Sequence, residues 1–333
     1  EKAAKAHKHL HIDQGKRALF ACEGLAAQVG PDTSGYTSTA LYPLADTFSL
    51  HSRPGSSKVI YLDFTGHTTA NTPWNSGVNA GVNIVTPVFD LDGDPTTFSD
   101  AERAAIQDIW RRVSEDYAPF DVDVTTEPPA QDRLSRSSSS DTVYGTTVVI
   151  TSRQGVYSCS CGGIAYVGVY NSAATDYYKP AFVFYNMLGS GAEKPVAEAI
   201  SHEAGHNIGL HHDGTATTSY YAGQGTDAVT GWAPIMGVSY YKQLTQWSKG
   251  EYLNANNTED DLAIISGSAN GFGYADDEAG DTLAAAAPPR RCPVAPALAY
   301  TETMTDPGPL IEPLIPALRR YAYALCRDHA AAD

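Results

Sequence analysis

Apolar residues are spaced along the chain in patterns that predict five strands and two helices. Runs of about four to eight β-branched and aromatic residues, alternating with polar ones or continuous, are typical of strands. The predicted strands span residues 58–64, 120–126, 146–151, 163–170 and 181–186. The order strand, helix, four strands, helix predicts an α/β (α+β) fold, in which helices pack on a mixed sheet.

The first of these helices, predicted over residues 99–117, has a recognisable start and end. Ser99 and Glu102 have the spacing of a capping box, in which each side chain accepts a hydrogen bond from the other residue's backbone. Pro119 ends the pattern. Between them, apolar residues recur every three or four positions, at Ile106, Ile109, Trp110, Val113 and Tyr117.

Composition divides the chain into four parts. Residues 1–57 join a basic, helix-prone segment (1–20) to a linker rich in Gly, Pro, Ser and Thr (30–57), and residues 58–266 hold the predicted strands and helices. Residues 267–309 are rich in Gly, Ala and acidic residues, as in a linker or the start of a further module. Residues 310–333 have an amphipathic helical pattern.

Charge and hydropathy argue against two classes of partner. The formal net charge of −16 would repel a polyphosphate backbone, so nucleic acid is not expected to bind. No run of about 18 apolar residues predicts a membrane span. The chain opens with Glu1 and without a signal segment, so we expect a processed form or a fragment. Nothing in the sequence predicts an oligomeric state.

The second helix carries a metal-binding pattern in the segment AEAISHEAGHNIGLHHDG (197–214). His202 and His206 are four residues apart and therefore lie on one face of a helix, where both imidazoles can reach one metal. Glu203 follows the first histidine and is placed to take a proton from a metal-bound water. The other face, with Ile200, Ala204 and Ile208, is expected to pack on the sheet.

A third histidine follows a glycine that can end the helix. Gly209 tolerates a positive φ, so the chain can turn sharply there and return His212, rather than His211, to the same metal. Three histidines leave a fourth position for water, whose pKa a zinc ion lowers to about 7. The alternative is that these are ordinary surface histidines on a helix, with no metal-binding role.

The spacing H-E-x-x-H-x-x-G-x-x-H, from His202 to His212, resembles the metzincin clan of zinc metallopeptidases. This resemblance implies a mixed, mostly parallel five-stranded sheet, an active-site helix, and a C-terminal subdomain with a Met-turn, here at Met236 in GWAPIMGVSYY. Residues 58–266 would then be the catalytic domain, and residues 1–57 would include a propeptide-like segment.

Two further features are similar to the reprolysin (adamalysin)-like branch, and closest to its bacterial secreted members. Asp213 directly follows the third histidine, where the branch has an Asp that supports the turn below the site. GGIAYVG (162–168) resembles the strand along the cleft, to which an extended substrate adds by main-chain hydrogen bonds. Val238 stands where related enzymes have a Tyr that assists at the metal, and Tyr240 and Tyr241 are interpreted as packed aromatics.

The resemblance predicts a secreted, extracellular zinc endopeptidase that cleaves proteins or peptides. Zinc would be held by His202, His206 and His212, Glu203 would be the general base, and Gly209, Asp213 and Met236 would support the site. The alternative is a catalytically inactive zinc-binding adhesin or scaffold. The last 20 or so residues resemble the start of an extracytoplasmic-function sigma factor, so a regulatory fusion is a third hypothesis.

Calcium is a second candidate cofactor. Asp90, Asp92 and Asp94 have the spacing of the first ligands of a calcium loop. Gly93 and Ala101 depart from that pattern, so an acidic loop is the alternative.

The cysteines, Cys22, Cys159, Cys161, Cys292 and Cys326, are too few and odd in number for a disulfide framework. Cys159 and Cys161 are expected to be buried or bridged to each other. Cys22 precedes the catalytic domain, and some metzincins stay latent because a propeptide cysteine fills the open position of zinc. A latency role for Cys22 is therefore a hypothesis.

Overall fold

The computed structural model describes residues 9–13, 15–24, 39–78, 81–225 and 230–276. The chain divides into two units, Glu1–Gly273 and Tyr274–Asp333, and every element named below belongs to the first. The cysteines at 292 and 326, the tail pattern (310–333) and most of the predicted linker (267–309) lie outside the described residues.

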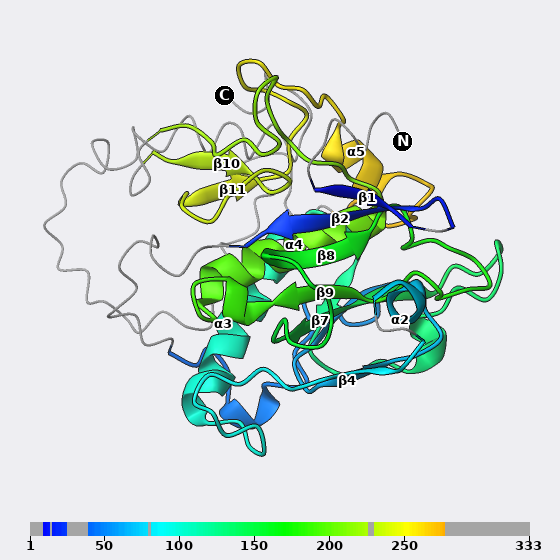
Figure 1. Ribbon diagram of the computed structural model, residues 1–333, viewed down its shortest axis with the longest axis vertical. Coiled ribbons are helices and arrows are strands. Elements are labelled where there is room, and N and C mark those ends of the chain that lie inside the picture. Colours follow the sequence, from blue (N-terminus) through cyan, green and yellow to red (C-terminus); the bar gives the residue numbers. More distant parts are fainter. Residues whose placement is uncertain (1–8, 14, 25–38, 79–80, 226–229, 277–333) are drawn as a thin grey trace, which may run out of the picture. The chain divides into compact units, whose positions relative to one another are not determined.

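A mixed sheet forms the centre of the described part of the chain (Figure 1). Its order is β1-β2-β8-β9-β7-β3-β6. The bounds are β1 Leu10–Ile12, β2 Ala18–Glu23, β3 Lys58–Asp63, β6 Asp123–Thr125, β7 Tyr144–Thr151, β8 Cys161–Tyr166 and β9 Ala181–Phe184. β9, β7, β3 and β6 are parallel, whereas β8 is antiparallel to β9. All five strands predicted from apolar runs are therefore present, with four of them parallel, but β1 and β2 extend the sheet to seven strands instead of the predicted five.

Two long helices cover one face of this sheet. They are α3 (Asp100–Asp116) and α4 (Glu193–Ile208). Side chains alternate across the sheet: Val148 and Ile150 of β7 belong to the same core as both helices, while Val149 between them belongs to a second core. The second core packs against Trp74 of α2 (Pro73–Val78) and Ile84 of β5 (Ile84–Thr86). The strands are buried on both faces, which explains their nearly continuous apolar sequences.

The capping box predicted for the first helix is present. The Ser99 side chain accepts from the Glu102 backbone N–H, and the Glu102 carboxylate accepts from the Ser99 backbone N–H at 2.8 Å. Glu102 is almost completely buried, and its other oxygen accepts from the Leu91 backbone N–H at 2.7 Å, which satisfies the buried carboxylate. The cap thereby also fixes the acidic loop that precedes α3.

The N-terminal segment differs from its sequence prediction. Within the described part of residues 1–20, β1 and β2 form an antiparallel pair, and no helix is present there. β2 continues as an antiparallel partner of β8 (Figure 1, where the blue strand lies beside the green one). Tertiary pairing with an available sheet edge outweighs the weak helix propensity of these residues. Residues 39–57 are also packed: Leu50 is buried and its backbone N–H donates to the Thr126 hydroxyl.

Shorter elements complete the described structure. They are η1 (Leu44–Asp46), β4 (His67–Thr69), η2 (Gln131–Arg133), η3 (Tyr185–Met187), β10 (Trp232–Pro234), β11 (Leu244–Gln246) and α5 (Asp261–Ser266). β4 pairs with β5, and β10 pairs with β11 in parallel. Among the described residues, no helix has the length and apolar character that crossing a bilayer requires.

Candidate metal centre

Helix α4 and the turn after it bring three histidine rings together. His202 and His206 lie one turn apart, with ring centroids 4.7 Å from each other. Gly209 ends the helix with φ at 118°, a conformation that L side chains rarely adopt, and its backbone N–H donates to the carbonyls of Gly205 and His206. After this turn the Nε2 atom of His212 lies 3.0 Å from the Nε2 atom of His206.

Backbone hydrogen bonds orient these rings. Nδ1 of His202 lies 2.9 Å from the Ile235 carbonyl, and Nδ1 of His206 lies 2.8 Å from the Leu210 carbonyl. A carbonyl only accepts, so each Nδ1 carries the proton and each Nε2 presents a lone pair. Nε2 of His202 is buried and has no hydrogen-bond partner in the described structure.

Burial keeps the three imidazoles neutral. It lowers the pKa of His202 to about 4 and the pKa values of His206 and His212 well below their usual value. Neutral imidazole is the form that binds metal. The buried lone pairs of these rings would be costly without a ligand.

A fourth donor reaches the same point from the N-terminal strand. The pleat of β2 directs Leu19 and Ala21 into the second core, so Phe20 and Cys22 face α4. The Sγ atom of Cys22 lies 3.4 Å from Nε2 of His206 and 3.4 Å from Nε2 of His212. Cys22, His202, His206 and His212 each offer a ligand atom within 4.8 Å of the others, and all four are buried.

These four donors fit a tetrahedral zinc ion. Zinc bonds of about 2.0–2.1 Å to nitrogen and 2.3 Å to sulfur imply N–N separations of about 3.3 Å and N–S separations of about 3.6 Å at tetrahedral angles. The observed 3.0 Å between the two Nε2 atoms and 3.4 Å to the sulfur are close to these values. The set of one thiol and three imidazoles is also one that zinc prefers.

Glu203 lies beside the histidines without belonging to the ligand group. It is buried, and its Oε2 atom has no hydrogen-bond partner among the described residues. Gly163 of β8 allows this approach, because a Cβ there would lie 2.4 Å from Oε1 of Glu203. Burial raises the pKa of Glu203 well above its usual value while β2 covers it.

Met236 and Asp213 lie close to the helix and the turn that carry the histidines. Met236 is fully buried against α4, where a Cβ on Gly205 would lie 2.7 Å from its sulfur. The Asp213 backbone N–H donates to the Met236 carbonyl at 2.8 Å, so the residue after the third histidine is tied to this turn. Burial, and then Glu251 and Glu259, raise the pKa of Asp213 to about 7.

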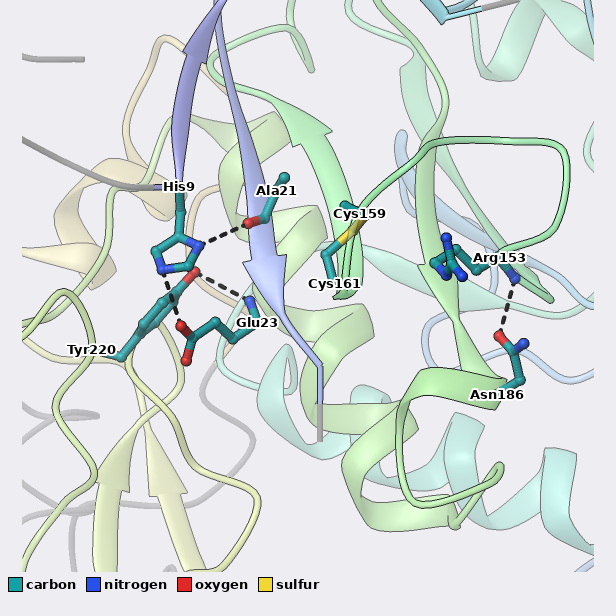
Figure 2. Close-up of a disulfide and its surroundings, with 8 residues drawn as sticks. All are labelled: His9, Ala21, Glu23, Arg153, Cys159, Cys161, Asn186 and Tyr220. Carbon is teal, nitrogen blue, oxygen red and sulfur yellow. Dashed lines mark hydrogen bonds and ion pairs between the residues drawn. A yellow bond between two sulfur atoms is a disulfide. The ribbon is translucent and has the colours of Figure 1, made fainter. Parts of the chain in front are cut away.

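Two tyrosines hold the backbone of β2 next to Cys22. The Glu23 backbone N–H donates to the Tyr220 hydroxyl at 3.3 Å, and the Tyr240 hydroxyl donates to the Glu23 carbonyl at 3.2 Å. Figure 2 shows Tyr220 and His9 both directed at Glu23, with His9 forming an ion pair to its carboxylate at 3.2 Å. Tyr240 is therefore not only a packed aromatic. Sequence reasoning missed Tyr220, which lies in an irregular loop with no motif of its own.

β8 is not an exposed edge in this structure, contrary to the sequence prediction. β2 pairs along it from Leu19↔Tyr166 to Glu23↔Cys161, so the N-terminal strand occupies the site at which an extended substrate was expected. Cys161 at the start of β8 forms a disulfide with Cys159, which confirms the predicted local bridge (Figure 2).

The neighbouring His211 points to a different partner. Its Nδ1 atom lies 2.9 Å from the Glu259 carboxylate, and this hydrogen bond raises the pKa of His211. Of the two adjacent histidines, only His212 belongs to the cluster.

The acidic loop gives no support to a calcium site. Ligand atoms of Asp90, Asp92 and Glu102 lie within 4.8 Å of one another. However, Asp90 accepts from the Gly93 backbone N–H, Asp92 accepts from that of Asp94, and Glu102 caps α3. The Asp94 carboxylate accepts hydrogen bonds from the hydroxyls of Thr96 and Thr97. The carboxylates are thus used by the loop itself.

Comparison with known proteins agrees with the geometry of the centre. Residues 99–248 match the model of a family described as metallo-peptidase family M12. This match supports a zinc metallopeptidase of the metzincin type. It runs from the cap of α3 past β11, so it includes the three histidines and Met236 but not β2. No curated protein is found to match the chain.

Proposed function

We propose that this protein is a zinc endopeptidase in which His202, His206 and His212 hold the metal and Glu203 is the general base. The observation that carries the proposal is the meeting of three neutral, buried imidazoles, with ring centroids 4.7–5.1 Å apart, beside a carboxylate that takes no part in the cluster. A secreted, reprolysin-like enzyme acting on extracellular proteins or peptides is the form of this function that we favour.

A bound zinc ion would supply Lewis acidity to the attacking water and to the scissile carbonyl. Glu203 takes the proton from the attacking water and then delivers it to the leaving amine, because its carboxylate is next to the first histidine and its Oε2 atom has no hydrogen-bond partner among the described residues. Nδ1 hydrogen bonds to Ile235 and Leu210 hold the two helix histidines in the orientation that metal binding requires. Gly209, Asp213 and Met236 support the site.

The adjacent pair His211 and His212 offers a matched test of the ligand set. Purified chains that carry Cys22→Ser are loaded with zinc and analysed for metal content and for casein digestion with and without a chelator. We expect His212→Gln to lose most of the zinc and the digestion, and His211→Gln to keep both. Equal zinc in the two variants would remove His212 from the ligand set. Zinc retention without digestion, in the parent and in Cys22→Ser alike, would favour the inactive adhesin or scaffold.

We also propose that residues 9–24 inhibit the enzyme from within. The thiol of Cys22 lies where a fourth ligand would stand, and β2 fills the strand position beside β8. Thiolate binds zinc well, so the segment excludes both water and substrate. Cys22→Ser should digest casein faster than the parent before any processing. Ala21→Ser, on the opposite face of the same strand, is the control. An unchanged rate in Cys22→Ser would contradict this role.

A further inference from the structure

Tyr220 lies beside the histidine cluster, on the side that is covered by β2 and Cys22. The Tyr220 ring packs against His212, with centroids 4.3 Å apart, and its centroid is 6.2 Å from that of His202. The hydroxyl accepts from the Glu23 backbone N–H at 3.3 Å and also interacts with the Cys22 side chain. The same thiol interacts with the carboxylate of Glu203. Three side chains with acid–base chemistry therefore converge on one point beside the histidines.

The proton of this hydroxyl has one evident acceptor. A tyrosine hydroxyl donates one hydrogen bond and can accept others. The backbone N–H of Glu23 donates to this hydroxyl, so the O–H of Tyr220 is available to donate to an atom at the position of the neighbouring Cys22 thiol. The ordinary pKa of a tyrosine hydroxyl is about 10, so this group is a neutral hydrogen-bond donor near neutral pH.

We propose that Tyr220 is a further catalytic residue, whose hydroxyl stabilises the oxyanion that forms on the scissile carbonyl oxygen. This rests on the proposed function. The sulfur of Cys22 occupies the position that the scissile carbonyl oxygen of a substrate takes after β2 has been displaced. When water attacks, its oxygen bonds to the carbonyl carbon and the π electrons move to the carbonyl oxygen. The O–H of Tyr220 then donates to that oxygen. The C–N bond breaks, Glu203 returns the proton to nitrogen, and Tyr220 keeps its own.

Tyr240, the second tyrosine that hydrogen-bonds to the backbone of Glu23, is expected to behave differently. Its hydroxyl donates to the carbonyl of Glu23, one residue beyond the thiol, and so it holds the backbone of the occupant rather than the reacting atoms. Loss of this hydroxyl should weaken substrate binding, which raises KM, and leave kcat nearly unchanged. Tyr220 should show the opposite split, because its contact gains strength only as charge develops on the oxygen.

The neighbouring Tyr221 is the matched control. Its ring stacks on Tyr252 with centroids 4.0 Å apart and lies in the same loop as Tyr220. Tyr220→Phe, Tyr221→Phe and Tyr240→Phe are made in the full Cys22→Ser chain and loaded with zinc. Zinc content is measured by elemental analysis, and kcat and KM are measured on a fluorogenic peptide. Binding of a phosphinic pseudopeptide, with a tetrahedral phosphinate in place of the scissile amide, is measured by calorimetry.

We expect full zinc content in all three variants. Tyr220→Phe should lower kcat by roughly 10- to 100-fold and weaken phosphinate binding by a similar factor, since the metal carries part of the charge. Tyr221→Phe should match the Cys22→Ser chain. Unchanged kcat and phosphinate affinity in Tyr220→Phe, a loss of its zinc, or an equal fall in Tyr221→Phe would each overturn the inference. If the zinc-loaded Cys22→Ser chain itself cleaves nothing, the proposed function fails and the inference falls with it.

Discussion

Two groups of potential metal ligands in this protein contrast with each other. In the histidine cluster at the end of α4, the buried Nε2 atom of His202 has no hydrogen-bond partner among the described residues, and the nearest groups to the other two Nε2 atoms are each other and the Cys22 thiol. The acidic loop before α3 brings carboxylates equally close, yet the loop backbone or the helix cap already uses them. Proximity of ligand atoms is therefore a weaker indication of a metal site than buried atoms left without a partner.

The largest expected effect is the loss of kcat on substitution of Glu203, the proposed general base of the histidine cluster. Glu203→Gln keeps the shape of the side chain but cannot take a proton from water. We expect full zinc content and a fall in kcat of about 10²–10⁴-fold. Metal analysis and casein digestion of Glu203→Gln in the Cys22→Ser chain test this prediction. Activity equal to that of the Cys22→Ser parent would show that another group is the base.

The second prediction tests whether the acidic loop is a structural cap. Glu102→Ala leaves two backbone N–H groups without their acceptor and should cost about 2–3 kcal/mol of unfolding free energy. Denaturant unfolding measures this loss. Glu115→Ala, at an exposed ion pair near the end of α3, should change it little. Added calcium should not raise the melting temperature of the parent, and a rise that Glu102→Ala abolishes would restore the calcium interpretation.

The third prediction concerns the turn that completes the histidine cluster and that the acidic loop lacks. Gly209→Ala places a Cβ in left-handed backbone and should cost about 1–2 kcal/mol. The nearest atom to this Cβ is 3.8 Å away, so the cost comes from conformation and not from crowding. Gly209→Asn should lose less, since Asn tolerates this region better. Equal losses in thermal unfolding would indicate a different cause.

The smallest expected effect is a pH dependence of stability from His51, which is paired with carboxylates, unlike the histidines of the cluster. Burial lowers the pKa of His51, but hydrogen bonds to Glu127 and Asp123 outweigh it and raise that pKa. The pair therefore stabilises the fold below about pH 6.5, and this contribution is lost as pH rises through the higher folded-state value. The stability difference between parent and His51→Gln should shrink between pH 5.5 and 8.5. A pH-independent difference in urea unfolding would contradict this.

Local sequence patterns predicted much of the fold and the residues that meet at the centre. The capping box at Ser99 and the five strands rest on short-range periodicity, and all are present. The strand predicted over 120–126 is shorter, and the one predicted to reach 170 ends at Tyr166, before Gly168 with its positive φ. Spacing also anticipated that His212 rather than His211 joins the pair on the helix. Its role as a ligand stays a prediction.

Long-range pairing explains what local patterns missed. β2 forms because β8 offers an edge far along the chain, so propensity within the described part of residues 1–20 pointed to the wrong element. Tyr220 belongs to a loop whose path depends on contacts with Glu23 and His212, and no periodicity marks it. A hydroxyl in irregular backbone becomes a candidate only when the fold places it.

The pleat of β2 directs alternate side chains to opposite faces of the strand. Even-numbered positions 20 and 22 face the histidines, and odd-numbered positions 19 and 21 face the opposite core. A slip of one residue along β8 would withdraw the sulfur and place the methyl group of Ala21 or the carboxylate of Glu23 at its position. The proposed inhibition by Cys22 therefore requires the observed register, and a peptide derived from β2 should inhibit only when it pairs with β8 in that register.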